Sequence, residues 1–267
     1  MRACSGPQLH HFATPPSPLA KPSSLLVLTL TLGFLACSRG LNLSQYPTPE
    51  ALMDASIQKF NEGKCGAAET GFERLTFELP SRDPRQAIAR FYLAECSFKR
   101  KLYLQATRDY RRVSNEYPSD TLAPLSLLRT GEAYSKLWRR VELDATYGLS
   151  ALTVYQELLR RYPSSPQATQ ARERITVLNE KFAHKEYRTG IFYMRLKAYD
   201  SAILSFKTVV ADYPQSTYAA EALLKLVEAF DRIGYQEDKK DMCVQLERFY
   251  PEALKRASAC PGQNAVP

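Results

Sequence analysis

Histidine is scarce in this 267-residue chain, which has only three. His10 and His11 stand near the N-terminus, so His184 is the single candidate base in the rest of the chain for a Ser-His or Cys-His arrangement. The cysteines form no C-x-x-C pair and have no paired histidines to complete a zinc site. The motifs G-x-G-x-x-G, G-x-x-x-x-G-K-[ST], H-E-x-x-H and the EF-hand loop are absent as well. We therefore expect no cofactor, no metal and no catalytic residues, and a protein that is not an enzyme.

Long apolar runs are also absent, apart from one near the N-terminus. Residues 25–35 form an eleven-residue apolar run, too short to span a bilayer as a helix but typical of the central part of a secretory signal. It ends in Phe34-Leu35-Ala36-Cys37, which resembles the lipoprotein box of bacterial signal peptides. The resemblance implies a signal peptide over 1–36, lipid on Cys37 and a tether over 37–48. The alternative is an ordinary secreted protein with Cys37 free or in a disulfide.

The excess of positive charge is mild. The formal charge of +8 falls to +6 when the first 36 residues, with Arg2 and Lys21 and no acid, are removed. The basic residues are dispersed in pairs such as Arg111-Arg112 and Arg160-Arg161. Solvated helix faces are the favoured interpretation, and a nucleic-acid surface is disfavoured.

Residues 186–234 contain the clearest helical pattern. Apolar residues recur at steps of three or four, which places them on one side of a helix; they are Tyr199, Ala202, Ile203, Phe206, Val209, Val210 and Tyr213. Pro214 must mark an end, since a proline inside a helix costs ~3 kcal/mol. Apolar spacing predicts another helix before this one, over 187–194, and one after Pro214, capped by Ser216 or Thr217.

The dipeptide Tyr-Pro indicates a repeated unit. It recurs at spacings of 45, 51 and 37 residues, at Tyr117-Pro118, Tyr162-Pro163, Tyr213-Pro214 and Tyr250-Pro251. At fixed offsets before the prolines stand an alanine and an aromatic residue, in the pairs Ala106 and Tyr110, Ala151 and Tyr155, and Ala202 and Phe206, with an earlier pair, Ala68 and Phe72, before Pro80. This pattern resembles the tetratricopeptide repeat.

The repeat predicts an all-α fold, a tetratricopeptide-repeat superhelix of about five antiparallel helix pairs over residues 49–256, with a flexible tail over 257–267. Helix starts agree with this register, because Thr48, Asp83 and Ser165 each precede a proline. Copy three carries eight extra residues, around 138–148. Copy five has Lys239 where alanine is expected and is interpreted as a cap.

Four cysteines follow Cys37. In an oxidising compartment they are more often structural than reactive. We expect one bridge between Cys65 and Cys96, on neighbouring copies, and another between Cys243 and Cys260, which would tie down the tail; the alternative is four free thiols.

Residues of copies three and four carry a more specific resemblance. The segment from Ala151 through Tyr162-Pro163 to Ile175, then Lys185 to Tyr193 and Tyr213-Pro214, is similar to the BamD family of outer-membrane assembly lipoproteins. The resemblance covers about residues 44–250 and includes the insertion in copy three. It implies a scaffold without catalysis, anchored by lipid in the outer membrane and facing the periplasm. Its implied partners are the barrel subunit BamA, other subunits of the β-barrel assembly machinery, and the C-terminal segments of unfolded outer-membrane proteins.

Repeat geometry suggests which residues would form the peptide groove of copies one and two. They are Met53, Ile57, Phe60, Phe91 and Phe98. For each of them, packing in the core between helices is an equally good interpretation. For docking on BamA we expect the last two copies, with Lys207 and Arg232 as charged contacts.

Two other functions remain open at this point. One is a different repeat scaffold of the cell envelope, such as a Tol-Pal-associated protein or a pilus-assembly lipoprotein; the former normally has a coiled-coil front, and no sustained heptads precede copy one. The other is a lipoprotein hydrolase that uses Cys-His or carboxylate chemistry in the groove.

Overall fold

A computed structural model describes residues 40–260. Over this range the chain forms helices and no strand, as the repeat pattern predicts. The helices are η1 (Leu43–Gln45), α1 (Pro49–Asn61), α2 (Cys65–Glu78), α3 (Pro84–Lys99), α4 (Tyr103–Glu116), α5 (Leu122–Leu137), α6 (Thr146–Arg161), α7 (Pro166–Arg195), α8 (Tyr199–Asp212), α9 (Tyr218–Ile233), α10 (Gln236–Phe249) and α11 (Pro251–Leu254). Within this range, none of the helices combines the length and apolar composition needed to cross a bilayer.

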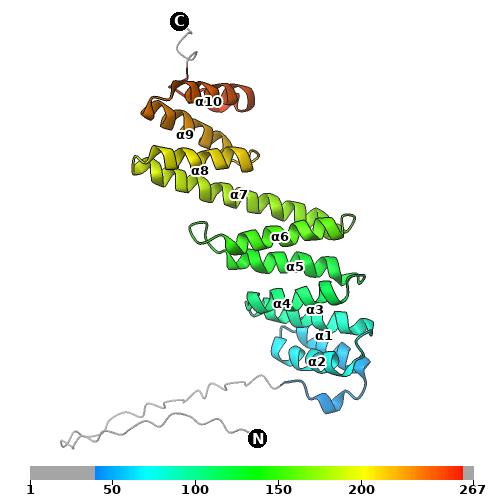
Figure 1. The fold of residues 1–267 in the computed structure, drawn as a ribbon. Helices are drawn as coiled ribbons and strands as arrows, with labels where there is room; N and C mark the ends of the chain where they lie inside the picture. Colours follow the sequence, from blue (N-terminus) through cyan, green and yellow to red (C-terminus); the bar gives the residue numbers. More distant parts are fainter. Residues whose placement is uncertain (1–39, 261–267) are drawn as a thin grey trace, which may run out of the picture. The chain divides into compact units, whose positions relative to one another are not determined.

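The helices α1 to α10 form five antiparallel pairs, each packed on the next along the chain (Figure 1). The first helices of successive pairs also touch one another, α1 with α3, α3 with α5, α5 with α7 and α7 with α9. These helices therefore form one continuous layer. The fold is all-α and of the tetratricopeptide-repeat class, because each pair buries its apolar face only against its neighbours.

Small and aromatic residues at the repeated offsets hold the first four pairs together. All eight of them are fully buried, namely Ala68, Phe72, Ala106, Tyr110, Ala151, Tyr155, Ala202 and Phe206. The aromatic ring of a second helix lies against a glycine of the first helix: a Cβ atom on Gly131 would lie 2.3 Å from the Tyr155 ring, and one on Gly190 would lie 2.5 Å from the Phe206 ring. Glycine at these positions permits the close approach of the two helices.

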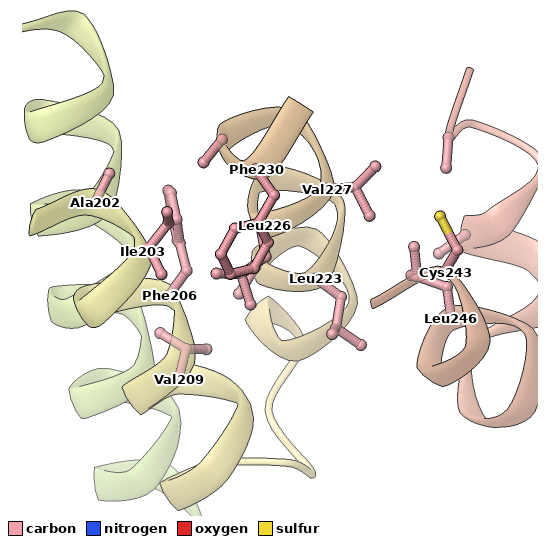
Figure 2. Packing of buried hydrophobic residues seen from close by; sticks show 14 of the residues in the cluster. Ala202, Ile203, Phe206, Val209, Leu223, Leu226, Val227, Phe230, Cys243 and Leu246 are labelled. Carbon is pink, nitrogen blue, oxygen red and sulfur yellow. The ribbon is translucent and has the colours of Figure 1, made fainter. Parts of the chain in front are cut away.

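The core of the last two pairs shows the same principle across three helices. Phe206 of α8 faces Leu226 and Phe230 of α9, and Leu246 of α10 closes the other side of α9 (Figure 2). Each Leu or Phe buried in this way stabilises the fold by roughly 1.5–3 kcal/mol. Stacking of pairs, rather than any single pair, therefore supplies the core.

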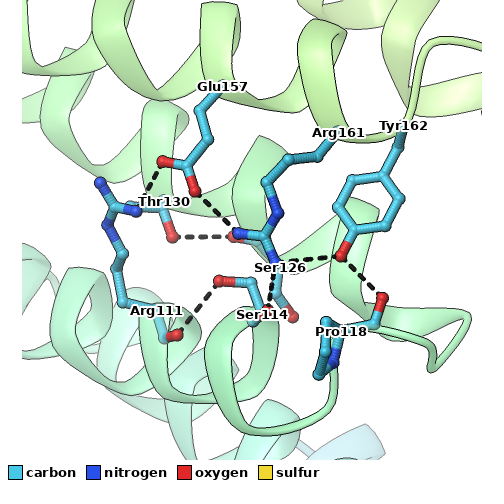
Figure 3. A network of polar contacts seen from close by, with 8 residues as sticks. All are labelled: Arg111, Ser114, Pro118, Ser126, Thr130, Glu157, Arg161 and Tyr162. Atoms are coloured by element: carbon cyan, nitrogen blue, oxygen red, sulfur yellow. Dashed lines mark hydrogen bonds and ion pairs between the residues drawn. The ribbon is translucent and has the colours of Figure 1, made fainter.

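The tyrosine of the Tyr-Pro dipeptide that follows α6 forms a hydrogen bond to the preceding helix pair. The Tyr162 hydroxyl donates to the Pro118 carbonyl oxygen at 2.7 Å, and Arg161 donates to the Ser114 carbonyl oxygen at 2.8 Å (Figure 3). In the same network Glu157 of α6 pairs with Arg111 of α4 at 2.6 Å. Here the Tyr-Pro dipeptide thus joins the two consecutive second helices α4 and α6.

All four predicted helix starts are observed, and three of the four predicted capping side chains are confirmed. The side chains of Thr48, Asp83 and Ser165 accept hydrogen bonds from backbone N–H groups of the first turns of α1, α3 and α7. At α9, however, Thr217 makes no capping bond with its own side chain. Instead the Glu180 carboxylate, from α7, accepts from the Thr217 N–H at 3.0 Å and from its hydroxyl. A carboxylate at a helix N-terminus is favourable because it faces the positive end of the helix dipole.

The extra residues of the array lie at two places. The predicted insertion of copy three is a segment, residues 138–145, between α5 and α6. The expected helix over 187–194 is only the end of α7, a continuous 30-residue helix that begins at Pro166. α7 is long enough to pack on α5 and α6 and also on α8 and α9.

Both ends of the described range pack on the array. Leu41, inside the predicted tether, is buried against the first pairs, and Tyr46 packs there too. At the other end Ala257 and Cys260, inside the predicted tail, are buried against α9 and α10. The segment predicted as a lipidated tether therefore contributes to the core from Leu41 onward, and the tail does so as far as Cys260.

The two expected disulfides have different outcomes. Cys243 and Cys260 are bonded, as predicted, and Cys243 occupies the aromatic position of copy five. The bridge between Cys65 and Cys96 was a wrong prediction, since both are buried free thiols. The Cys96 thiol lies 3.8 Å from the Cys65 carbonyl oxygen and donates to it. Burial raises the Cys96 pKa, which disfavours the thiolate that disulfide formation requires.

Candidate functional site

The five residues predicted for the groove divide into two groups. Met53 and Phe60 of α1 and Phe91 of α3 are buried. The rings of Phe60 and Tyr92 form a T-shaped contact, with their centroids 5.0 Å apart. These three belong to the core between helices. Ile57 and Phe98 are partly exposed, and each lines a surface depression.

Phe98 lines a hollow that is bordered by four helices. The hollow has a volume of about 430 Å³ and lies between α3, α5, α6 and α7. It is lined by Phe98, Arg129, Glu132, Ser135, Lys136, Tyr155, Arg174, Val177, Leu178 and Lys181, which we call the groove.

Helical spacing explains why these side chains meet. On α5, Arg129, Glu132 and Lys136 are three and four residues apart, so they lie on one face. On α7, Arg174 and Lys181 are seven residues apart, two turns along the same face. Because α5 and α7 are consecutive first helices in contact, the two faces border one hollow.

The groove is positively charged. Its lining has four cationic side chains, those of Arg129, Lys136, Arg174 and Lys181, and one carboxylate, Glu132. Glu132 pairs with Arg129 at 2.8 Å and with Arg174 at 3.0 Å, which fixes both guanidinium groups. The excess of cations attracts an anion, and the preset arginines are suited to a carboxylate.

A buried carboxylate beneath the groove positions Arg129. Glu95 lies 3.0 Å from the Arg129 guanidinium and accepts a hydrogen bond from the Tyr110 hydroxyl at 2.7 Å. Burial and the neighbouring Glu95 charge raise the Tyr110 pKa, so the phenol remains a donor. Arg129 is therefore held by Glu132 on one side and by Glu95 on the other.

Part of the groove lining is apolar, and we call this part the apolar floor. Phe98 and Leu178 contribute to it, and Val177 has 64% of its surface exposed. Tyr155 is fully buried, and burial raises its pKa to about 12. Apolar and cationic side chains in one lining suit a ligand that has both an apolar group and a negative charge.

The groove has no catalytic arrangement among its lining residues. The one histidine of the described range, His184, is not part of the lining; its ring lies parallel to that of Tyr218, with centroids 4.8 Å apart. Among residues 40–260, no group of three or more His, Cys, Asp or Glu side chains is arranged to hold a metal ion.

The other predicted site residues lie elsewhere. Lys207 of α8 is exposed, with its ammonium 5.2 Å from the centre of the Phe230 ring, and Arg232 is exposed in the last turn of α9. Both remain predictions for partner docking. Cys37, the predicted lipidation site, lies outside the described residues.

Comparison with known protein families assigns the chain to one of them. A model of the YfiO family, described as outer membrane lipoprotein, matches residues 46–246. This match spans most of the chain. The chain belongs to the YfiO outer-membrane lipoprotein family. The YfiO match includes every residue that lines the groove, whereas Cys37 and Cys260 lie beyond it.

Two curated relatives of the chain share one name. The protein from Caulobacter vibrioides, named outer membrane protein assembly factor BamD, is 30% identical over 138 residues, which are 52% of this chain and 45% of that protein. In that comparison, the chain spans less than half of the relative's length. The protein of the same name from Rickettsia prowazekii is 23% identical over 234 residues, 86% of this chain and 91% of that protein.

Solved structures offer a more distant likeness. A tetratricopeptide-repeat protein of Thermus thermophilus is 22% identical, with 79% of this chain and 98% of that chain covered and a TM-score of 0.36. A score this low supports no conclusion, and the fold assignment rests on the helix pairs themselves.

Sequence reasoning found Phe98 but missed the cations of the groove. The sequence patterns single out none of Arg129, Lys136, Arg174 and Lys181. The seven-residue spacing of Arg174 and Lys181 was a usable signal, since it places two cations on one face of one helix. That α5 and α7 would border the same hollow needed the packing of the array.

Proposed function

We propose that this protein is an outer-membrane protein assembly factor, as its curated BamD relatives are named. It acts as a scaffold without catalysis, in which the groove binds extended C-terminal segments of unfolded outer-membrane proteins. Arg129, Lys136, Arg174 and Lys181 bind the terminal carboxylate, and the apolar floor binds an aromatic side chain at the end of the segment. The observation that supports this most directly is the combination of four cations with an apolar floor in one hollow.

The charge of the groove selects the end of a chain over its middle. An internal segment carries no main-chain charge, whereas a C-terminus brings a carboxylate that guanidinium groups bind in bidentate fashion. Arg129 and Arg174 are already fixed by Glu132, so little side-chain freedom is lost on binding. A peptide that ends in phenylalanine matches both parts of the groove.

Binding of such a peptide tests the proposal. We would measure fluorescence anisotropy of a labelled ten-residue peptide that ends in phenylalanine, with its C-terminal carboxylate free or amidated. The free acid should bind more tightly, and Arg174→Glu should weaken its binding at least ~10-fold, because a charged hydrogen bond contributes about 1.5–3 kcal/mol. Arg82→Glu, the same change at an exposed site outside the groove, is the matched control. Equal affinity for acid and amide would contradict the proposal.

Docking on the barrel subunit BamA is the second part of the proposal. Lys207 and Arg232 are exposed on neighbouring helices of the last two pairs and are open to contact with acidic groups of a partner. Charge reversal at both positions should reduce co-purification of a large β-barrel protein with the membrane-extracted chain. If the double variant retains its partner in full, these residues do not form the contact.

Anchoring at the outer membrane through Cys37, facing the periplasm, completes the proposal. It is supported by the Ala36-Cys37 pattern after the apolar run and by membership of a lipoprotein family. Each buried lipid methylene contributes ~0.8 kcal/mol, and two chains suffice for stable anchoring. Cys37→Ala should release the protein from the membrane fraction, and mass spectrometry of the N-terminal peptide should show acyl chains on the wild type. A wild-type N-terminal peptide without acyl chains would refute the anchor.

A further inference from the structure

The insertion of copy three is fastened to α7 by a row of three cations. We call residues 138–145 the strap. Lys181 donates to the Trp138 carbonyl oxygen, and Lys185 donates to the carbonyl oxygens of Val141 at 3.3 Å and Leu143 at 3.1 Å. Arg188 forms an ion pair with Glu142.

The spacing of these cations shows that they act as one set. Positions 181, 185 and 188 follow one another at four and three residues, so the three side chains lie on one face of α7. They reach the strap from its first residue to beyond its middle. The extra length of α7 and the extra residues of copy three are thus partners in one contact.

Trp138 is the core of this contact and the only tryptophan of the chain. Its side chain is 1% exposed and stacks on Phe182 with ring centroids 4.8 Å apart. A Cβ atom on Gly148 would lie 2.4 Å from the indole, so glycine is required beneath it. The buried indole N–H has no hydrogen-bond acceptor among the described residues. The strap is therefore closed with one polar group left unsatisfied, which is unfavourable.

Lys181 of α7 contacts the strap and also lines the groove. Its ammonium lies 4.3 Å from the centre of the Trp138 ring and donates to the Trp138 carbonyl, and the same side chain lines the groove with Arg129 and Arg174. No carboxylate is paired with it among the described residues, and burial lowers its pKa. A carbonyl oxygen and an aromatic face are weaker partners for an ammonium than a carboxylate is.

We propose that a carboxylate bound in the groove takes Lys181 from Trp138 and loosens the strap, which couples occupancy of the groove to the strap surface. This inference rests on the proposed function of the groove. The surface that changes is a hollow of about 330 Å³ between strap and α7, lined by Val141, Glu142, Lys185, Arg188, Thr189 and Phe192. Filling of the groove is thereby signalled to a second face of the protein.

The coupling is reciprocal, because the groove and the strap surface are both linked to the same equilibrium between a closed and a loosened strap. A ligand that loosens the strap binds more tightly to a protein whose strap is already weakened. Arg188 and Glu142 lie outside the groove, so breaking their ion pair weakens the strap without changing any groove contact. A purely structural strap would lack this effect on ligand affinity.

Emission of Trp138 gives the first test, in the full chain and with the peptide described above. Binding of the free-acid peptide, followed independently by anisotropy, should shift the tryptophan emission and raise its quenching by acrylamide. Lys181→Met should bind the peptide more weakly and show no change of emission on binding. Lys136→Met, which removes a groove cation that does not touch the strap, should weaken binding yet keep the full change of emission at saturation.

Reciprocity gives the second test. Arg188→Gln should tighten binding of the free-acid peptide by about two- to fivefold, the range that corresponds to one exposed ion pair. Arg195→Gln, at an exposed site at the end of α7, should leave affinity unchanged. Peptide binding without any change at Trp138, or unchanged affinity in Arg188→Gln, overturns the coupling while the proposed function stands. Absence of peptide binding overturns the proposed function, and the coupling with it.

Discussion

The Tyr162 hydroxyl donates a 2.7 Å hydrogen bond to the carbonyl oxygen of Pro118, so the Tyr-Pro dipeptide of one pair is bound to that of the pair before it. The same bond recurs between Tyr250 and Pro214 at 2.6 Å. At the pair built on α7, Tyr213 instead stacks on Phe182, with centroids 6.1 Å apart. The proline ends a helix, and the tyrosine of the next pair satisfies a carbonyl that the helix end leaves free. Two of the four Tyr-Pro dipeptides, those at Tyr162 and Tyr250, therefore make the same contact.

Loss of this hydroxyl should destabilise the array. Tyr162→Phe keeps the ring and removes the donor to Pro118, so we expect the free energy of unfolding to fall by about 0.5–1.5 kcal/mol. Urea unfolding followed by circular dichroism measures it. In Tyr235→Phe, a control at an exposed tyrosine, the free energy of unfolding should fall by much less. Equal losses in the two variants would show that the bond to Pro118 contributes nothing.

A methyl group at Gly71 should be poorly tolerated. Its Cβ would lie 2.0 Å from the Ser56 hydroxyl oxygen, and overpacking of this kind costs about 1–3 kcal/mol. Gly71→Ala should therefore lower the unfolding midpoint, although alanine is the better helix former. Adding Ser56→Ala removes the clashing hydroxyl oxygen without placing a glycine inside α1, and it should restore most of the loss. A double variant no more stable than Gly71→Ala alone would mean that the clash is not the cause.

Reduction of the Cys243 to Cys260 bond should loosen the last pair. The bond closes a loop with a sequence separation of 17, for which the chain-entropy estimate is about 3 kcal/mol. Thermal unfolding should show a lower midpoint when a dithiol reductant is added. The variant in which both cysteines are replaced by serine should already have the lower midpoint and should not respond to reductant. Any further response in that variant would point to a different thiol.

Acid should weaken the start of α3. Hydrogen bonds from Arg85 lower the Asp83 pKa from 3.8 to about 2, so the carboxylate is favoured in the folded state. Because the folded pKa is depressed, this stabilisation is present above pH 3.8 and is lost as the pH falls towards about 2. The unfolding midpoint should therefore drop more steeply over this window in the wild type than in Asp83→Asn. Parallel pH profiles would refute the role of Asp83.

Much of the fold could be predicted from local chemistry. The prolines after Thr48, Asp83 and Ser165 mark helix starts, and the alanine and aromatic offsets mark the contact between paired helices. Both signals act within a few residues, through backbone geometry and the helical period. The cap of α9 could not be found in this way, because Glu180 is 37 residues from Thr217 and approaches it only through packing.

The candidate site, too, could be predicted from the sequence only in part. Phe98 was predicted from its place on a first helix, yet Met53, Phe60 and Phe91, chosen on the same ground, are core residues. A helical period tells which residues share a face, but not whether a neighbouring pair covers that face. Only the packing of successive pairs decides it.

The amino-acid sequence alone therefore determined the helical pairs, the family resemblance and the place of the insertion, since each depends on patterns that are short in sequence. The tertiary structure alone decided that α5 and α7 bring four cations around one hollow and that Lys181 is shared between this hollow and Trp138. Those contacts join residues more than forty positions apart, such as Glu132 and Arg174. Their partners are set by how the pairs stack, which no local pattern specifies.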